Sequence, residues 1–204
     1  VRNTKEIFQT VRNHRGRANH AIPVAAPLET PEAYPILAPY LLGVWLGDGT
    51  SRAGSVTSMD AEVFNAFYRA GFEAGSKQQK PNNKAATQTF LGLQQILRAL
   101  GLLRNKHIPT EYLRASLQQR LALLQGLMDT DGTATSTGSV EFTSTNRRLA
   151  EGVLELIVSL GWKARMIESR ATLYGRDYGP KWDIKWTGTR EQIASTERSV
   201  DDLK

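Results

Sequence analysis

The sequence predicts a mixed fold of helices and strands that is built from two copies of one unit. The first observation is a near repeat of an apolar helical segment, L-L-G-V-W-L-G-D-G-T at residues 41–50 and L-L-Q-G-L-M-D-T-D-G-T at residues 123–133. The second is that a Gly-Ser-Val strand pattern follows each segment, at residues 54–56 and 138–140. A pattern that recurs after roughly 80 to 95 residues indicates two copies related by a pseudo-two-fold axis.

The composition excludes several classes of protein. The chain has 204 residues, 40% of them hydrophobic, so we expect a globular protein with a sizeable core. No apolar run approaches the roughly 20 residues that span a bilayer, so we expect no membrane partner. Cysteine is absent, which excludes disulfides, thiolate zinc sites and cysteine nucleophiles and fits an intracellular, cytoplasmic location. His14, His20 and His107 show no ligand spacing, so a Ser-His-Asp hydrolase has little support.

The first half begins with an extension rich in basic residues and proline. Residues 4–12 suit a short helix capped by Thr4, and residues 13–39 hold five of the eight prolines, so we expect a strand or two before residue 39 and no long helix. Pro39 suits the first turn of a helix over residues 40–47. A strand at residues 54–58, a helix capped by Asp60, a polar hairpin over residues 76–90 and a helix over residues 93–100 follow.

The second half replays this order. Apolar residues at helical spacing predict a helix over residues 113–129, and the Gly-Ser-Val pattern predicts a strand after it. Asn146 suits the cap of the next helix. Strands are expected around residues 163–169 and 181–186, and a last helix near Thr189 or Arg190. The predicted division is therefore an extension at 1–38, a first repeat at 39–115 and a second repeat at 116–204.

Small residues at a spacing of four predict that the two repeated helices pack closely. Gly43 and Gly47 lie on one helix face, and Gly126 and Thr130 have the same spacing in the partner. Packing of this kind would bring Asp48 and Asp131 together at the helix C-termini, where the macrodipole disfavours negative charge. A hard divalent cation such as Mg²⁺ would compensate, and carboxylates with Mg²⁺ indicate phosphoryl transfer.

An ordinary structural role competes with this interpretation. Asp-Gly after a helix is also a common end of a helix and the start of a turn. One such motif favours the structural role, whereas two motifs that are each followed by Thr and a Gly-Ser-Val strand favour catalysis. Asp129 is a third acid, and because the first copy has Leu46 at that position we treat Asp129 as secondary.

The strand segments carry basic and amide side chains, the residue types that contact phosphates and base edges. The net charge of +6 permits a polyanionic partner, although a solvated sheet face would also explain either cluster alone. In the first half the candidates for DNA binding are Arg52, Ser55, Thr57, Lys77, Gln78, Gln79, Lys80, Asn82, Asn83, Lys84, Thr87 and Gln88. In the second half they are Thr135, Ser139, Glu141, Thr143, Lys163, Arg165, Arg170, Thr172, Tyr174, Arg176, Lys181 and Lys185.

These motifs resemble those of the LAGLIDADG (dodecapeptide) homing endonucleases, in the monomeric two-repeat form found in inteins. The resemblance covers residues 39–204 and implies an α+β fold of two αββαββα repeats, with the motif helices central and two β-saddles gripping double-stranded DNA. It implies an endodeoxyribonuclease that uses Mg²⁺ (or Mn²⁺), with Asp48 and Asp131 as catalytic metal ligands beside Gly47 and Thr130. Lys106, in the segment N-K-H-I-P, matches the family's catalytic lysine, and Lys204 is roughly placed as its counterpart in the second repeat.

The resemblance further implies that the chain comes from a larger intein precursor, with residues 1–38 leading from a splicing domain. The expected activity is site-specific hydrolysis of both strands at a long DNA target. The alternative is a catalytically decayed or maturase-like binder of DNA or RNA on the same scaffold. A phosphatase acting on small molecules lacks support because the chain has no glycine-rich phosphate loop.

Overall fold

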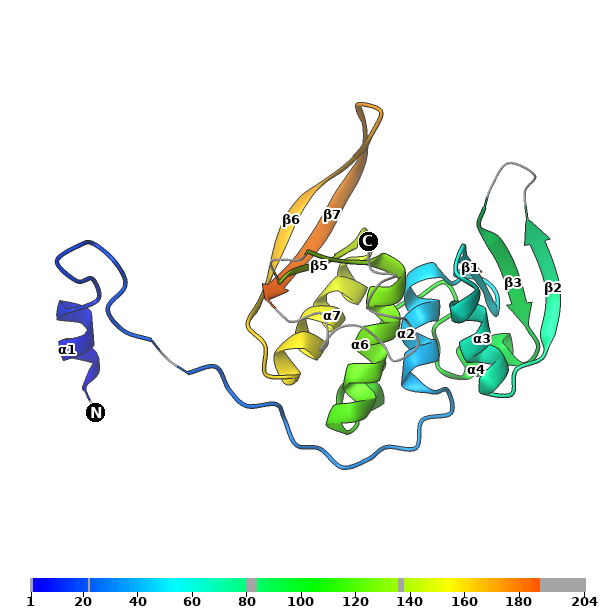
Figure 1. Ribbon diagram of the computed structural model, residues 1–204, viewed down its shortest axis with the longest axis horizontal. Helices are drawn as coiled ribbons and strands as arrows, with labels where there is room; N and C mark the ends of the chain where they lie inside the picture. The colour runs from blue at the N-terminus through cyan, green and yellow to red at the C-terminus, as the bar shows by residue number, and fades with distance from the viewer. Residues whose placement is uncertain (1, 22, 80–83, 136–137, 188–204) are drawn as a thin grey trace.

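The computed structural model describes residues 2–21, 23–79, 84–135 and 138–187. In these ranges the chain has two antiparallel sheets that flank a central pair of helices, which confirms the predicted α+β class (Figure 1). None of the helices in the described ranges is long and apolar enough to cross a lipid bilayer.

The first repeat places a three-stranded sheet beside the central helix α2, in the order β1-β3-β2. Its elements are α2 (Pro39–Asp48), β1 (Ser55–Ser58), α3 (Ala61–Arg69), β2 (Ala74–Gln79), β3 (Ala86–Phe90) and α4 (Leu93–Ala99). An isolated bridge between Gly49 and Val56 stands where the second repeat has a full strand. Pro39 occupies the first turn of α2, as predicted, because its missing N–H needs no partner there.

The second repeat has the same order with a four-stranded sheet, β4-β5-β7-β6. Its elements are α5 (Thr110–Leu113), α6 (Leu117–Asp131), β4 (Gly132–Ala134), β5 (Ser139–Ser144), α7 (Arg147–Ser159), β6 (Ala164–Leu173) and β7 (Arg176–Thr187). The helices and strands from α6 to β7 follow the order αββαββ of the predicted repeat. The helix expected near Thr189 or Arg190 lies outside the described residues.

Matching caps align the two repeats residue by residue. The backbone N–H of Asp60 donates to Ser58 Oγ at 3.0 Å, and that of Asn146 donates to Ser144 Oγ at 3.1 Å. Asp60 and Asn146 each accept a hydrogen bond from the first turn of the following helix, as N-caps do. Strand β1 is therefore the counterpart of β5, and β3, the partner of β1, is the counterpart of β7, the partner of β5.

Three local predictions are wrong. Two of them place the start of a helix incorrectly, and the third predicts strands in the N-terminal extension. The first helix, α1 (Thr4–Gln9), is capped by Asn3 and not by Thr4. The helix predicted over residues 113–129 is interrupted, because Ser116 forms a capping box with Gln119 and starts α6 there. In the described part of residues 1–38 the only β pairing is an isolated bridge between Arg12 and Ala18.

An extended arm, residues 23–38, runs along the base of the second repeat (Figure 1). The backbone N–H of Leu28 donates to the Ser159 carbonyl at 2.9 Å, and Thr30 Oγ1 donates to the Ala115 carbonyl at 2.6 Å. Gln119 pairs with both backbone groups of Ala33. These bonds tie the arm to α6 and α7 before the chain enters α2.

The central helices α2 and α6, called the motif helices below, meet backbone to backbone. A Cβ atom on Gly43 would collide with the Leu123 carbonyl oxygen and lie 2.9 Å from the Leu127 nitrogen. A Cβ atom on Gly126 would collide with the Tyr40 carbonyl oxygen and lie 2.9 Å from the Val44 nitrogen. The two contacts are related by the pseudo-two-fold axis, so the glycine spacing correctly predicts the close packing.

We expect Gly43→Ala and Gly126→Ala each to lower the free energy of unfolding by about 3 kcal/mol or more, because the colliding atoms are backbone and cannot rotate away. Urea denaturation followed by circular dichroism measures this. Gly152→Ala in α7 is the matched control: its new Cβ would meet only Ile108 at 3.4–3.5 Å. That variant should gain about 0.5–1 kcal/mol from helix propensity. Equal stabilities for the Gly43 and Gly152 variants would contradict the backbone-to-backbone contact of the motif helices, called the seam below.

Candidate active site

The motif helices deliver two carboxylates to one place. Asp48 is the last residue of α2 and Asp131 the last residue of α6. A Cβ atom on Gly47 would lie 3.3 Å from Asp131 Oδ2 and would overlap the Thr130 side chain. The close approach at Gly47 therefore brings the end of one motif helix against the acid of the other, as predicted.

Lys106 reaches the same place from the loop after α4. Its ammonium donates a hydrogen bond of 2.8 Å to the Gly47 carbonyl oxygen and lies 5.1 Å from the centre of the Trp45 ring. Trp45 is fully buried, so the ammonium packs over an apolar ring close to the acids. A family resemblance predicted this lysine, and the structure gives it a defined position.

Burial in the site disfavours the charged forms of both Lys106 and Asp131. Burial lowers the pKa of Lys106 to about 8, while the charges of Asp131 and Asp48 act in the opposite direction. Although Asp131 keeps access to solvent, desolvation by the surrounding protein raises the pKa of its carboxyl, and Lys106 opposes that rise. A cation bound here would stabilise the ionised form of the carboxylates.

The loop that carries Lys106 is held by the second repeat. Asn146 Nδ2 donates a hydrogen bond of 2.7 Å to the Lys106 carbonyl oxygen, while Asn146 Oδ1 caps α7. Arg148 on the same helix donates to Asn105 Oδ1 at 2.9 Å. On the other side, the Arg104 N–H donates to the Ser51 carbonyl at 2.6 Å. Lys106 is therefore fixed by contacts to both repeats.

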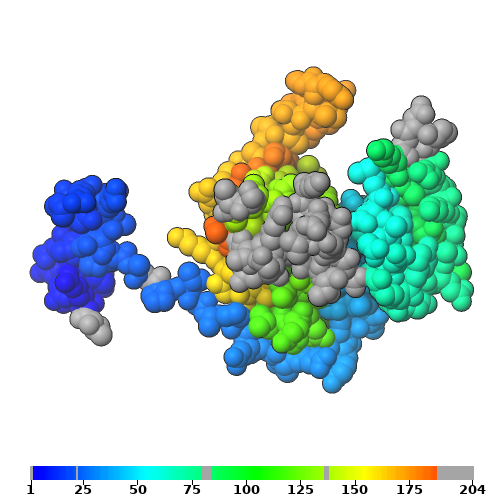
Figure 2. Space-filling view, in the orientation of Figure 1, coloured from blue at the N-terminus to red at the C-terminus, as the bar shows by residue number. Residues whose placement is uncertain are grey.

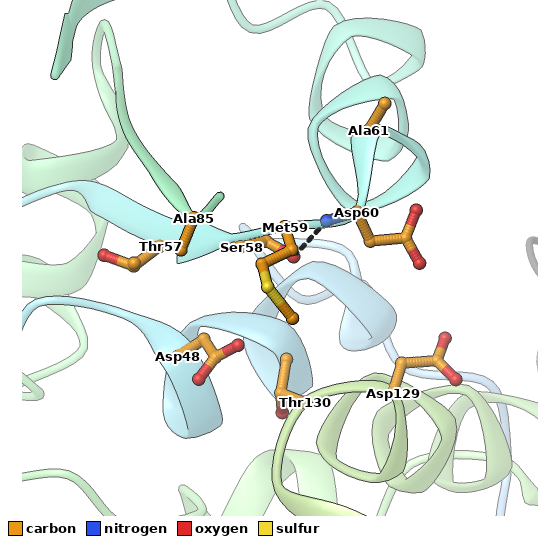
Figure 3. Close-up of a pocket in the computed structure, with 9 residues that line it drawn as sticks. All are labelled: Asp48, Thr57, Ser58, Met59, Asp60, Ala61, Ala85, Asp129 and Thr130. Atoms are coloured by element: carbon orange, nitrogen blue, oxygen red, sulfur yellow. Dashed lines mark hydrogen bonds between the residues drawn. The ribbon is translucent and has the colours of Figure 1, made fainter. Parts of the chain in front are cut away.

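Two cavities lie on either side of the joined helix ends. One, of about 420 Å³, contains Asp131, Lys106 and residues 143–146. The other, of about 690 Å³, contains Asp48, Asp129, Thr130 and residues 57–61 (Figure 3). Among the described residues that line the larger cavity there is no lysine or arginine, whereas the smaller cavity holds Lys106 and Arg104.

Asp129 has a structural partner. It is buried and accepts a hydrogen bond of 2.8 Å from the Tyr40 hydroxyl at the start of α2. In Figure 3 its carboxylate points away from Asp48, across the end of α6. This contact ties the two motif helices together and agrees with the secondary role expected for Asp129.

The donor atoms at the helix ends suit a hard divalent cation. Asp48 and Asp131 supply carboxylate oxygens, and the carbonyls of Gly47 and Thr130 lie next to them in the sequence. No group of three or more His, Cys, Asp or Glu side chains that could hold a metal occurs in the described part of the chain. Mg²⁺ keeps several waters and takes only one or two carboxylates together with substrate phosphates, so this sparse set fits it.

The first sheet presents fewer of the predicted DNA-binding residues than expected, because alternate residues of a strand face opposite sides. The face opposite the buried Val56 and Phe90, called the open face below, carries Thr57, Gln78 and Thr87. Gln88 is buried and donates to backbone carbonyls, and Lys77, paired with it in the ladder, lies 5.9 Å from the centre of the Phe64 ring.

The remaining first-half candidates are placed as follows. Gln79 pairs with the buried Ala86, so it lies on the helix side of the sheet with Lys77 and Gln88, and Ser55, which stands opposite Thr89, is buried. Arg52 and Lys84 are exposed in the turns beside the sheet. The candidates Lys80, Asn82 and Asn83, as well as the catalytic candidate Lys204, lie outside the described residues.

The second sheet gathers most of its predicted residues on one open face. Opposite the buried Val140, Phe142, Ile184 and Trp186, this face carries Ser139, Glu141, Thr143, Lys163, Arg165, Lys181 and Lys185. Lys185 forms an ion pair of 2.7 Å with Glu141. Thr135 lies in the β4–β5 turn, and Arg170, Thr172, Tyr174 and Arg176 lie on the part of the β6–β7 hairpin that projects beyond the body (Figure 1).

The two hairpins, β2–β3 and β6–β7, project on the same side of the molecule (Figure 1). They stand on either side of the motif helices, at the end where Asp48 and Asp131 lie. The space-filling view shows the two sheets as separate lobes on that side (Figure 2). This arrangement puts polar strand faces on both sides of a pair of acids.

Sequence reasoning missed two residues that organise the site. Asn146 was recognised as a cap, but its bond to Lys106 depends on the fold; the repeated pattern Ser-x-Asp and Ser-x-Asn at residues 58–60 and 144–146 was the available signal. Asp183 was not selected, yet it lies buried on the open face of the second sheet. The alternation Lys181, Asp183, Lys185 placed it on the same face as two chosen lysines.

Comparison with known proteins finds one matching family and one similar protein sequence. Residues 118–199 match the family described as "LAGLIDADG-like domain". The chain is 45% identical over 202 residues to a protein named replicative DNA helicase DnaB from Mycobacterium intracellulare. The match covers 98% of the chain but 32% of that protein, so the chain spans about a third of the relative's length.

Two solved structures share the fold. Mesophilic variants of the homing endonuclease I-DmoI superpose with a TM-score of 0.50 at 13% identity, over 76% of this chain and 90% of theirs. Full-length DUF199/WhiA from Thermatoga maritima superposes with a TM-score of 0.50 at 10% identity, over 84% of this chain and 60% of its own. At these identities the likeness establishes the fold alone. Residues 118–199, within the second repeat, are therefore similar to the LAGLIDADG-like domain family, and the chain shares its fold with these two structures.

We expect Lys106 in the metal-free protein to titrate near pH 8, and Asp131→Asn to lower its pKa further, because that substitution removes a negative charge that stabilises the ammonium. NMR of labelled lysine side chains, with a chelator present, measures both values. Glu141→Gln is the control, since Glu141 pairs with Lys185 and should leave Lys106 unchanged. A Lys106 pKa near 10.5 would show that the ammonium is solvated and not buried against Trp45.

Proposed function

We propose that this chain is a site-specific double-strand DNA endonuclease that depends on a divalent metal and is encoded within an intein. The observation that carries the proposal is the meeting of Asp48, Asp131 and Lys106 at the ends of the motif helices, between two polar sheet faces. A long duplex laid across both sheets would bring its phosphates to these acids. Carboxylates beside phosphates repel DNA unless a cation lies between them, so their placement favours catalysis over simple binding.

The residues of the chain divide the work. Asp48 and Asp131, with the adjacent carbonyls of Gly47 and Thr130, would hold Mg²⁺ or Mn²⁺, which when bound activates water and neutralises charge on the leaving oxygen. Lys106 would donate to the scissile phosphate from its position over Trp45, and its lowered pKa suits proton transfer near neutral pH. The open faces of the two sheets would position the duplex through phosphate and base contacts.

The similarity to a much longer protein supports the intein part of the proposal. The match to this chain covers 32% of the length of the helicase relative. A helicase motor needs a phosphate-binding loop, and this sequence contains no G-x-x-x-x-G-K-[ST] pattern. The matched part is thus explained as a separate module carried within the helicase precursor, and the likeness to homing endonucleases suggests the activity of that module.

We expect the chain with Mg²⁺ to cut both strands of a duplex that carries the uninterrupted helicase coding sequence. Asp48→Asn and Asp131→Asn should each reduce cutting on the order of 100-fold or more while binding persists, because they remove the metal's carboxylate and keep the shape. Gel electrophoresis of end-labelled strands measures cutting, and fluorescence anisotropy measures binding.

Asp60→Asn is the matched control for that experiment. Asp60 lines the same cavity as Asp48, but its side chain caps α3, and asparagine caps a helix equally well. The control should therefore cut like the unaltered chain. Tight, specific binding by the unaltered chain with no cutting under any divalent metal would instead identify a catalytically decayed or maturase-like binder.

A further inference from the structure

Asp183 is a buried carboxylate in the middle of a surface proposed to face DNA. It lies on β7, the strand between β5 and β6, with only 6% of its surface exposed. In the ladder it stands opposite Thr143 of β5, and its neighbour Lys181 stands opposite Ser169 of β6. The four side chains thus form one cluster on the open face of the second sheet.

Every hydroxyl of this cluster donates its proton to a carboxylate. Thr143 Oγ1 donates to Asp183 Oδ1 at 2.8 Å, with a longer contact of 3.3 Å to Glu141 Oε1, and Ser169 Oγ donates to Asp183 Oδ2 at 2.7 Å. Lys181 Nζ donates to Asp183 Oδ1 at 2.9 Å. An ionised carboxylate only accepts hydrogen bonds, so the direction of each bond is fixed.

The carboxylate stays ionised at neutral pH. Burial alone would raise the pKa of Asp183, but the hydrogen bonds from Lys181, Ser169 and Thr143 outweigh it and lower the pKa. Because each hydroxyl has one proton and that proton is committed, the oxygens of Thr143 and Ser169 can offer only lone pairs to a ligand. The two remaining protons of Lys181 can serve a phosphate without changing this.

The first sheet differs at the matching position. Thr57 is the counterpart of Thr143, and its partner Thr87 stands where the second sheet has Asp183. The two threonine oxygens are 2.7 Å apart, and either can be the donor. One hydroxyl proton is left over in this pair, so the first sheet can both donate and accept.

We propose that Asp183 makes the second sheet distinguish amino bases from keto bases in the DNA target, whereas the matching position of the first sheet tolerates both. This inference rests on the proposed DNA recognition and names part of its specificity. In the major groove adenine N6 and cytosine N4 donate hydrogen bonds, whereas guanine O6 and thymine O4 accept them. A hydroxyl without a free proton can pair with the first group, and it leaves a buried acceptor unpaired against the second.

The test begins with duplexes selected from a random pool by binding to the whole chain. Every base pair of the selected sequence is then changed singly, and binding is measured. For the unaltered chain, exchange of an amino base for a keto base at one or two adjacent positions in one half-site should weaken binding by about tenfold. The mirrored positions in the other half-site should change by less than about twofold.

Two reciprocal variants assign the effect to the residue. Asp183→Thr copies the first sheet and should abolish the discrimination, and Thr87→Asp copies the second sheet and should create it in the other half-site. Ser169→Ala, which removes one acceptor and alters the cluster least, should weaken binding to the amino base without favouring a keto base. Thermal melting of each variant checks that it is folded.

The outcomes separate the inference from the proposed function. If the unaltered chain selects no DNA sequence, the proposed function fails and the inference fails with it. If a sequence is selected but no position in either half-site distinguishes amino from keto bases, only the inference fails. Discrimination that persists in a folded Asp183→Thr variant also overturns it, because the preference then comes from other residues.

Discussion

The backbone contact between Gly43 and Gly126 is the constraint on which the rest of the structure depends. It fixes the separation and the register of the motif helices, and hence the positions of the two acids at their ends. A slip of one residue along a helix moves an end by about 1.5 Å, whereas metal ligands tolerate only about 0.2 Å. The seam has no room even for a Cβ atom. It therefore fixes the positions of the two acids more strictly than contacts between flexible side chains would.

Within this symmetric frame the two repeats carry different chemistry. Lys106 belongs to the first repeat but lines the cavity that contains Asp131 of the second repeat. Asn146 of the second repeat holds it there through its carbonyl oxygen. Asp129 meets Tyr40 where the first copy of the motif has Leu46. On the sheets, Asp183 replaces a threonine. The duplication thus supplies the geometry twice, and single substitutions on it supply differences between the two halves of the target and of the site.

The sequence predicts helices and their contacts, whose signals are local. It does not predict which strand face a residue occupies or which distant residue it contacts, because both depend on how the strands pair. Glycine spacing and the Asp-Gly endings predicted the seam and the meeting of the acids, because both follow from the period of a helix. Lys77, Gln79 and Gln88 lie on the helix side of the first sheet and not on its open face, because a cluster of polar residues along a strand occupies both faces in turn. Asn146 and Asp183 act through partners 40 residues away, Lys106 and Thr143; local patterns place the two residues on a cap and on a strand face, but the partner itself depends on the fold.

The arm shows how the molecule separates attachment from recognition. Arg120 is fully buried in the second repeat and has no carboxylate partner among the described residues. It donates instead to the carbonyls of Ala115, Ser159 and Leu28, and the last of these belongs to the arm. Breaking this set would leave a buried cation poorly paired, which is strongly unfavourable. The arm is thereby held at the base of the motif helices, whereas the acids and hairpins lie at the other end (Figure 1). In the proposed intein, a splicing domain that precedes the arm would then leave clear the face that the proposed DNA target would occupy.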